Sequence, residues 1–387
     1  MDFQLSDDQK ALQGRIDRFA QAEVAPRAEE LDREATFPAD LFRRVGEEGI
    51  LAIPFPKELG GLGLGVFEAT LAIEALARAD QSLAASTMIS MAAGLTVSRY
   101  GTETQKRTWL PDIIAGRGIC AIAGTEPGAG SDTGGLKTRA RRLDEGHWSL
   151  SGEKAFITNA GTPISTFALI LAITSAEDDP RTSFSLFLTP NDAPGYSRGT
   201  QYRKMGWRST DTRQLFLNDC RLGDEAVVGP LHGGRHILHK AYQAARLWLS
   251  ACSLGLAQSC LDRSIAYAKE RKAFGGTIGE RQLVQELIAQ MALKVDMARL
   301  LTYRAAWQVD RGIDDPGALS MAKLAATEIG TEVANMAVQV HGGWGVMDDC
   351  PVSRCLRDNR ICTIGDGTSQ IHTMLIARSC GLDVDFR

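Results

Sequence analysis

The spacing of apolar residues changes twice along this chain, and the order of these changes limits the folds that it can adopt. Over residues 1–118 apolar residues recur at helical spacing. Over residues 119–230 short apolar runs alternate with Gly, Pro, Asn and Asp, a pattern typical of antiparallel strands in a small barrel or sandwich. Over residues 231–387 the helical spacing returns. We therefore expect an α+β multi-domain fold with an N-terminal α-helical domain, a central β-barrel or sandwich and a C-terminal helical bundle.

The helical regions divide into shorter predicted elements. Ser6 and Gln9 form a capping-box pair at the start of the first helix. The segments after residue 231 have lengths suited to an antiparallel four-helix bundle. Helices are predicted over residues 39–48, 68–79 and 102–115 in the first domain, and over 236–271, 280–311, 317–341 and 352–380 in the last.

Composition and charge exclude several classes of protein. The net charge of −4 gives no electrostatic basis for binding nucleic acid. No apolar run reaches the roughly 18–20 residues of a membrane-spanning helix. The first ten residues lack the pattern of a secretion signal or a transit peptide, so we expect a cytoplasmic protein. The eight cysteines include no C-x-x-C pair, and reduced thiols are expected.

Five segments combine glycine with polar side chains and are candidates for a functional site. Glycine lets the backbone approach a ligand closely, and hydroxyl and amide groups can bind it. Each segment, taken alone, also fits an ordinary turn or helix end. The segments are residues 125–132, 156–160, 270–275, 339–345 and 364–370.

Two of these segments contain charged groups with specific chemical uses. The planar guanidinium of Arg271 can bind two oxygens of a diphosphate at once, although a cation near a helix C-terminus is also expected from the helix dipole. Asp366 lies between Gly365 and Gly367. Its carboxylate can cap a helix start or act as a base on a turn that approaches a substrate.

A metal site is not expected. Histidines at positions 232, 236 and 239 have helical spacing, but no acidic residue or cysteine lies beside them, and we interpret them as a solvated helix entrance. Three basic residues that alternate on a predicted strand are likewise assigned to an exposed face: Lys137, Arg139 and Arg141.

Taken together and in this order, the five segments resemble the acyl-CoA dehydrogenase family of flavoproteins. The resemblance runs from about Leu5 to Arg378, and more motifs lie in register with it. Those motifs are Tyr100-Gly101-Thr102-Glu103, Gln105-Lys106, Lys204-Met205-Gly206, Ser209, Asp211-Thr212-Arg213, Pro351-Val352 and Arg357-Asp358.

The resemblance implies an architecture and a reaction. The family has an N-terminal helical domain, a central β domain and a C-terminal four-helix bundle, which places boundaries here near residues 118 and 230, and it usually assembles as a homotetramer. It implies FAD as cofactor, an acyl-CoA substrate and electron-transfer flavoprotein as electron acceptor. In this reaction a carboxylate removes the α proton of the thioester while hydride leaves the β carbon for flavin N5.

The resemblance also implies roles for individual residues. Asp366 would be the catalytic base, and Gly365, Gly367, Ser131 and Arg246 would bind the substrate or support its pocket. The residues implied for the cofactor are Thr125, Ser131, Phe156, Thr158, Thr368 and Gln370 of the same subunit, with Arg271, Phe274, Gln339, Gly342 and Gly343 of a neighbouring subunit.

The sequence departs from the family at the catalytic turn. The family usually has Tyr-Glu-Gly-Thr where this chain has Gly365-Asp366-Gly367-Thr368. Asp is shorter than Glu by roughly 1 Å, a displacement that can lower a rate by about 10²-fold. Some members place the base immediately before the first-helix arginine, but Ala245 occupies that position here. We therefore expect Asp366 to act on an acyl group that is bulky at Cα or Cβ, such as cyclohexanecarboxyl-CoA.

Two other interpretations remain open from the sequence. The same scaffold also carries nitroalkane oxidases, which use an Asp base, as well as acyl-CoA desulfinases and flavin-dependent monooxygenases. The altered turn is also compatible with a flavin-binding protein that has no turnover.

Overall fold

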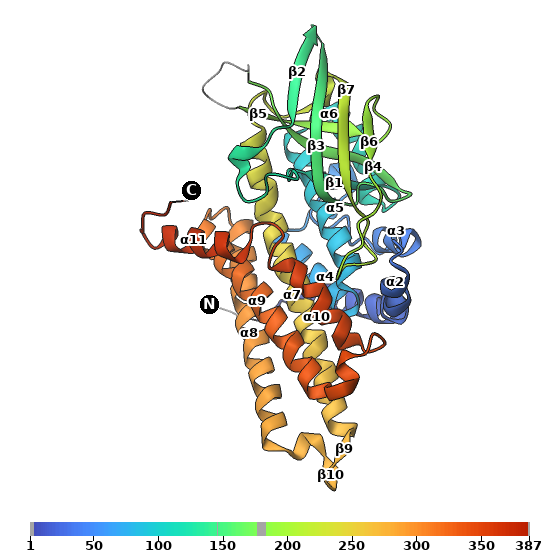
Figure 1. Ribbon diagram of the computed structural model, residues 1–387, viewed down its shortest axis with the longest axis vertical. Coiled ribbons are helices and arrows are strands. Elements are labelled where there is room, and N and C mark those ends of the chain that lie inside the picture. The colour runs from blue at the N-terminus through green and yellow to red at the C-terminus, as the bar shows by residue number, and fades with distance from the viewer. Residues whose placement is uncertain (1–3, 145, 176–182, 386–387) are drawn as a thin grey trace.

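The computed structural model describes residues 4–144, 146–175 and 183–385. Helices come first, a β domain follows, and a second set of helices completes the chain. Figure 1 shows the β domain at one end of the molecule and the C-terminal helices extending to the other, with helices α4 and α5 beside them. This order confirms the predicted α+β fold class.

The N-terminal domain is held together by two helices that are almost entirely buried. Helix α4 (Val66–Ala79) and helix α5 (Gln81–Tyr100) are apolar or small on nearly every face. Helix α5 has no polar face, so its sequence lacks the one-sided pattern by which a surface helix is recognised. The remaining helices are α1 (Asp7–Phe19), α2 (Ala28–Glu34), α3 (Ala39–Glu47) and α6 (Glu103–Ile114).

The β domain is one mixed eight-stranded sheet. Its strand order is β6-β7-β3-β2-β4-β5-β8, and β1 pairs with β4. The expectation of an antiparallel sheet is wrong for β1–β4 and β2–β4, which are parallel. Parallel pairing needs a long crossover connection, and β2 and β3 supply it between β1 and β4. The strands are β1 (Ile119–Ala123), β2 (Arg139–Asp144), β3 (His147–Thr158), β4 (Ser165–Ile173), β5 (Phe184–Pro190), β6 (Tyr196–Arg198), β7 (Thr212–Gly223) and β8 (Val227–Val228).

The C-terminal domain is organised around helix α7 (Gly234–Glu270), which runs from the β domain to the far end of the molecule (Figure 1). A two-stranded hairpin lies at that far end. The elements that follow α7 are β9 (Lys272–Ala273), β10 (Gly276–Thr277), α8 (Gln282–Asp310), α9 (Pro316–His341), α10 (Pro351–Cys362) and α11 (Ser369–Ser379).

The last predicted helix, residues 352–380, is wrong as a single element. It is two helices, α10 and α11, separated by residues 363–368. Asp366 has φ 53° and Gly367 has φ 101°. A right-handed helix cannot pass through positive φ values, so the chain turns at this point.

Gln81 joins all three parts of the chain through buried hydrogen bonds. Its side-chain oxygen accepts from the indole N–H of Trp207 in the β domain at 2.9 Å. Its side-chain nitrogen donates to the carbonyl of Cys252 and to the amide oxygen of Asn359, both at 3.1 Å, in the C-terminal helices. Since unpaired buried polar groups are costly, this junction favours one relative placement of the three parts.

The part of the chain that the structure describes holds neither a metal-binding cluster nor a membrane-spanning helix. Those residues contain no group of three or more His, Cys, Asp and Glu side chains arranged to hold a metal ion. None of the helices they form combines the length and apolar character needed to cross a bilayer. All eight cysteines lie in this part of the chain as free thiols.

Candidate active site

The turn between α10 and α11 presents Asp366 in a left-handed backbone conformation. A non-glycine residue at φ 53° is uncommon, and Asp is among the residues that tolerate it best. Thr368 ends the turn by accepting the backbone N–H of Ile371 at 3.3 Å, which caps helix α11. The turn is therefore fixed on its C-terminal side by the helix that follows.

Three side chains from three helices hold the carbonyl groups of this turn. The carbonyl of Asp366 accepts from Arg246 Nε of α7 at 3.1 Å and from His372 Nε2 of α11 at 3.2 Å. The carbonyl of Gly367 accepts from Lys323 Nζ of α9 at 2.6 Å. These bonds fix the two peptide groups after Asp366, and through them the direction of its side chain.

Burial and nearby cations act in opposite directions on the Asp366 carboxyl. Burial raises its pKa above the usual value, while the positive charges of Arg246 and Lys323 lower it. Burial also lowers the pKa of Lys323, to about 8, and that of His372, to about 3. His372 is therefore neutral near pH 7. When its Nε2–H donates to Asp366, its Nδ1 has no hydrogen-bond partner among the described residues.

Open space lies beside the turn at Gly365. A Cβ atom built there would meet only the carbonyl oxygen of Ile361 at 3.7 Å and a methyl group of Leu249 at 3.8 Å. Both are ordinary van der Waals distances, so the position could carry a side chain. The absence of one in this sequence leaves that volume free next to Asp366.

The turn faces the end of strand β1 across helix α7. A Cβ atom at Gly124 would lie 2.8 Å from the hydroxyl of Tyr242, so this helix and the end of β1 are in close contact. Burial raises the pKa of Tyr242, and the charge of Asp366 raises it further. Tyr242 thus lies close to both elements and links the β domain to the catalytic turn.

Thr125, Phe156 and Thr158 lie on neighbouring backbone in the β domain. The carbonyl of Thr125 accepts from the N–H of Ala155 at 3.0 Å, which ties it to strand β3. Phe156 is 65% exposed, has φ 60° and packs against Tyr202 with ring centroids 5.4 Å apart. The exposed ring of Phe156, supported by the partly buried ring of Tyr202, suits a flat ligand.

The predicted site residues fall into two groups. One group comprises the turn and the α7 arginine together with the β-domain residues: Gly365, Asp366, Gly367, Thr368, Gln370, Arg246, Thr125, Ser131, Phe156 and Thr158. The other lies at the far end of the bundle, where the β9–β10 hairpin is drawn in Figure 1 and where Tyr267 stacks on His341 with centroids 4.4 Å apart: Arg271, Phe274, Gln339, Gly342 and Gly343. A single chain does not bring the two groups together.

Three side chains that surround Asp366 were not predicted from the sequence. Lys323, His372 and Tyr242 lie on three different helices, so no local motif contains them together. Lys323 did carry a signal, because it is a charged residue within a helix segment of alanine, leucine and methionine. A lysine in such a segment is rarely fully buried without a partner.

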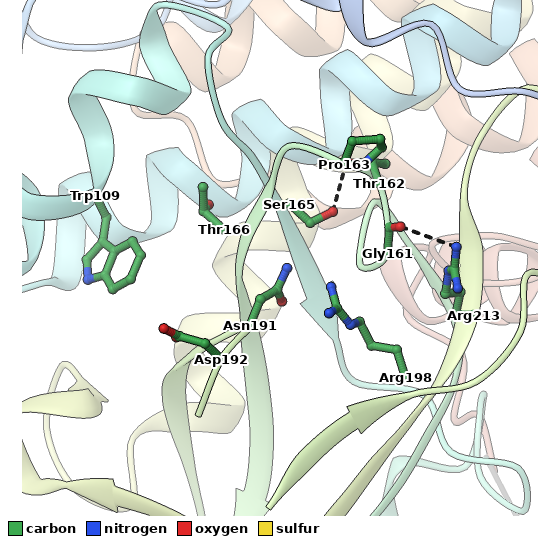
Figure 2. A pocket seen from close by; sticks show the side chains of 10 residues that line it. All are labelled: Trp109, Gly161, Thr162, Pro163, Ser165, Thr166, Asn191, Asp192, Arg198 and Arg213. Carbon is green, nitrogen blue, oxygen red and sulfur yellow. Dashed lines mark hydrogen bonds between the residues drawn. The ribbon is translucent and has the colours of Figure 1, made fainter. Parts of the chain in front are cut away.

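A separate cavity of about 750 Å³ lies at the edge of the β domain, next to α6. Figure 2 shows Trp109 and Arg213 on opposite sides of it. Arg213 pairs with Asp211 at 2.6 Å and donates to two backbone carbonyls, so a bound anion would have to compete with these contacts. The residues that line the cavity come from α6 and the β domain, and none belongs to the catalytic turn. They are Trp109, Gly161, Thr162, Pro163, Ser165, Thr166, Asn191, Asp192, Arg198 and Arg213.

Comparison with known proteins identifies the family. Models of the N-terminal, middle and C-terminal domains of acyl-CoA dehydrogenases match residues 6–117, 121–220 and 232–381. The chain belongs to the acyl-CoA dehydrogenase family. It is 37% identical over 380 residues to the probable acyl-CoA dehydrogenase YngJ of Bacillus subtilis, covering 98% of this chain and 99% of that one. It is 38% identical to the mitochondrial isobutyryl-CoA dehydrogenase of Dictyostelium discoideum, covering 98% of this chain and 90% of that one.

Several solved structures superpose on almost the whole chain. Butyryl-CoA dehydrogenase from Megasphaera elsdenii matches with a TM-score of 0.94 at 28% identity, covering 99% of this chain and 100% of that one. A chain from a structure described as an electron transferring flavoprotein of Acidaminococcus fermentans matches with a TM-score of 0.95 at 32% identity and the same coverage. PigA with FAD and proline matches with a TM-score of 0.93 at 30% identity, again with that coverage.

Substitution of Gly367 tests the contact between the turn and His372. A Cβ atom at Gly367 would lie 2.9 Å from His372 Nε2, whereas one at Gly381 would meet no described atom within 4 Å, although both glycines have positive φ. Gly381→Ala should therefore cost only backbone strain, about 1 kcal/mol. Gly367→Ala should lower the thermal midpoint further, because it also displaces His372. Equal midpoints for the two variants in calorimetry would contradict this contact.

Proposed function

We propose that this protein is an FAD-dependent acyl-CoA dehydrogenase in which Asp366 removes the α proton of the thioester. The observation that carries the proposal is the half-buried Asp366 on a left-handed turn whose backbone carbonyls accept hydrogen bonds from Arg246 and Lys323. The resemblance to the family assigns the base to this turn. Burial raises the pKa of this carboxyl toward the range in which a base both ionises and accepts a proton efficiently.

The residues present fit FAD. The exposed ring of Phe156 offers a flat apolar surface, and Thr125 and Thr158 lie beside it with hydroxyl groups for hydrogen bonds. At the other end, a Cβ atom at Gly342 or Gly343 would meet no described atom within 4 Å, which leaves room for a ligand against the backbone. FAD, when bound, supplies the acceptor for hydride from the substrate's β carbon.

The protein's own groups bind, orient and deprotonate the substrate. We assign proton removal to Asp366 and stabilisation of the charge on the thioester oxygen to the backbone N–H of the same residue, as in the family. One such donor contributes about 2.7–4 kcal/mol to transition-state binding. Arg246 and His372 support both roles by holding the Asp366 carbonyl from the side of the bundle.

We infer that the acyl group is branched or cyclic at Cα or Cβ. The free volume beside Gly365 lies next to a base that is shorter than the family's Glu, so a bulkier substrate would fill the space and bring its α C–H to Asp366. The similarity to isobutyryl-CoA dehydrogenase supports a branched acyl group, and the similarity to PigA with proline supports a ring. Cyclohexanecarboxyl-CoA is the test substrate that combines both features.

We further infer that the protein assembles as a homotetramer and passes electrons to electron-transfer flavoprotein. The similarity to the Acidaminococcus fermentans structure supports electron-transfer flavoprotein as the acceptor. Assembly is supported by a row of exposed apolar residues at helical spacing along α8, which a second copy of the chain would cover. The row consists of Leu283, Leu293, Met297, Leu300 and Trp307.

Asp366→Asn should keep FAD bound but lower flavin reduction by about 10²–10⁴-fold, because the amide cannot accept the α proton. The measurement is anaerobic bleaching of the flavin after mixing with isobutyryl-CoA or cyclohexanecarboxyl-CoA. Asp192→Asn, in the separate β-domain cavity, is the control and should bleach at the wild-type rate. Reduction of Asp366→Asn within a few-fold of wild type would exclude Asp366 as the base.

Gly365→Tyr should discriminate against bulky substrates, because the ring occupies the free volume beside Asp366. We expect bleaching by cyclohexanecarboxyl-CoA to slow by about 10–200-fold relative to bleaching by butyryl-CoA. Gly365→Ala is the graded control, since its methyl group meets nothing closer than 3.7 Å. The substrate assignment would be wrong if butyryl-CoA bleached the wild-type enzyme faster than every branched or cyclic ester.

Phe274→Ala should weaken both assembly and FAD binding. The Phe274 ring is 94% exposed at the tip of the hairpin, at φ 54°, where a neighbouring subunit's cofactor would cover it. The expected result is a lower FAD content after dialysis and a smaller mass by light scattering at low concentration. Leu143→Ala removes an exposed apolar side chain from β2 and should change neither. A wild-type monomer with full FAD content would refute the assignment.

A further inference from the structure

Lys323 is fully buried although it carries an ammonium group. Its Nζ donates to the carbonyl of Gly367 at 2.6 Å, which is a neutral acceptor. Burying a charge beside a neutral acceptor costs free energy, because no opposite charge is paired directly with it. The adjacent helical residues, Ala322 and Ala326, are apolar and also buried.

The three groups that hold the turn differ in how they respond to pH. Arg246 stays charged at every pH at which a protein folds, and His372 is neutral near pH 7 because burial lowers its pKa to about 3. Burial lowers the pKa of Lys323 to about 8, so it alone changes charge in the working range of an enzyme. Loss of its proton removes one of two positive charges that act on Asp366.

We propose that Lys323 is a positioning residue that holds the Gly367 carbonyl and keeps the adjacent Asp366 carboxyl in its ionised, proton-accepting form. The proposal rests on the proposed function of Asp366 as the base. The positioning role follows from the hydrogen bond to the Gly367 carbonyl, which fixes the second peptide group after Asp366. The effect on ionisation follows from the positive charge of Lys323, since a cation stabilises a nearby carboxylate relative to its neutral acid.

Other charged and titratable groups also act on Lys323, and they define what a pH experiment must separate. Arg246 opposes the protonated form of Lys323, whereas Asp366 favours it. The groups that face Lys323 are Asp366 of the turn, Arg246 of α7, Glu328 of α9, Cys362 of α10 and His372 of α11. Cys362 stays protonated over the pH range of the experiment, because burial raises its pKa to about 12.

Three substitutions of Lys323 separate hydrogen bonding from charge. Lys323→Gln keeps a donor but removes the charge, Lys323→Arg keeps both, and Lys323→Met removes both. Without the charge, the pKa of Asp366 should rise, so the acid limb of the bleaching rate against pH should move upward by about one pH unit. We expect this movement in the Gln and Met variants. In the Arg variant, which keeps the charge, the acid limb should stay at the wild-type pH. Lys10→Met, on exposed α1, is the control.

Hydrogen exchange of the turn, followed by mass spectrometry on a peptide covering residues 361–372, tests the positioning role without turnover. Lys323→Met should raise the exchange rate of this peptide by at least about tenfold, the effect of losing about 1.4 kcal/mol. Lys323→Gln and Lys10→Met should leave it near wild type. Because the Gln and Arg variants retain a donor, they keep the comparison valid if the Met variant does not fold.

Two results would overturn the proposal. One is an acid limb of Lys323→Gln that coincides with that of the wild type, and the other is unchanged exchange of the turn in folded Lys323→Met. Failure of the proposed function has a different appearance, since no acyl-CoA would then bleach the wild-type flavin. In that case the exchange experiment still decides whether Lys323 positions the turn.

Discussion

The backbone carbonyls of Asp366 and Gly367 need hydrogen-bond donors from outside their own turn, and the rest of the C-terminal domain supplies them. Positive φ values at both residues direct these carbonyls into the bundle, where a helical hydrogen-bond pattern cannot satisfy them. Arg246, Lys323 and His372 provide the donors from α7, α9 and α11. The base therefore has a fixed direction only when three helices are packed together, which makes the bundle a part of the active site.

The same donors set the chemical character of the base. Burial raises the pKa of Asp366 and favours its neutral acid, whereas the charges of Arg246 and Lys323 lower that pKa and weaken the carboxylate as a base. The structure combines both influences, and space is free at the neighbouring Gly365. A short carboxylate and a missing ring thus act together, because each gives room to a substrate that is wide near its reacting carbons.

Sequence patterns predicted those features that depend on local spacing. The order of helical and β parts, the start of α1 at Ser6 and the presence of a carboxylate on a glycine-flanked turn were all visible in the residues. Features that depend on contacts between distant segments could not be predicted from such patterns. The parallel pairing of β1 with β4, the burial of α5 on all sides, and the meeting of Lys323 with Gly367 need the folded chain, because no periodicity records which helices become neighbours.

The two groups of predicted cofactor residues impose a final constraint. One group surrounds the Asp366 turn and the β domain, while Phe274, Gln339 and Gly342 lie exposed at the opposite end of the bundle. If both groups bind the same cofactor, they must come from different copies of the chain. Exposed apolar residues along α8 lie between these ends, so the surface that joins two copies would also fix the distance between the two half-sites. A complete cofactor site would then exist only in the assembled protein, and dilution should release FAD before it unfolds the turn.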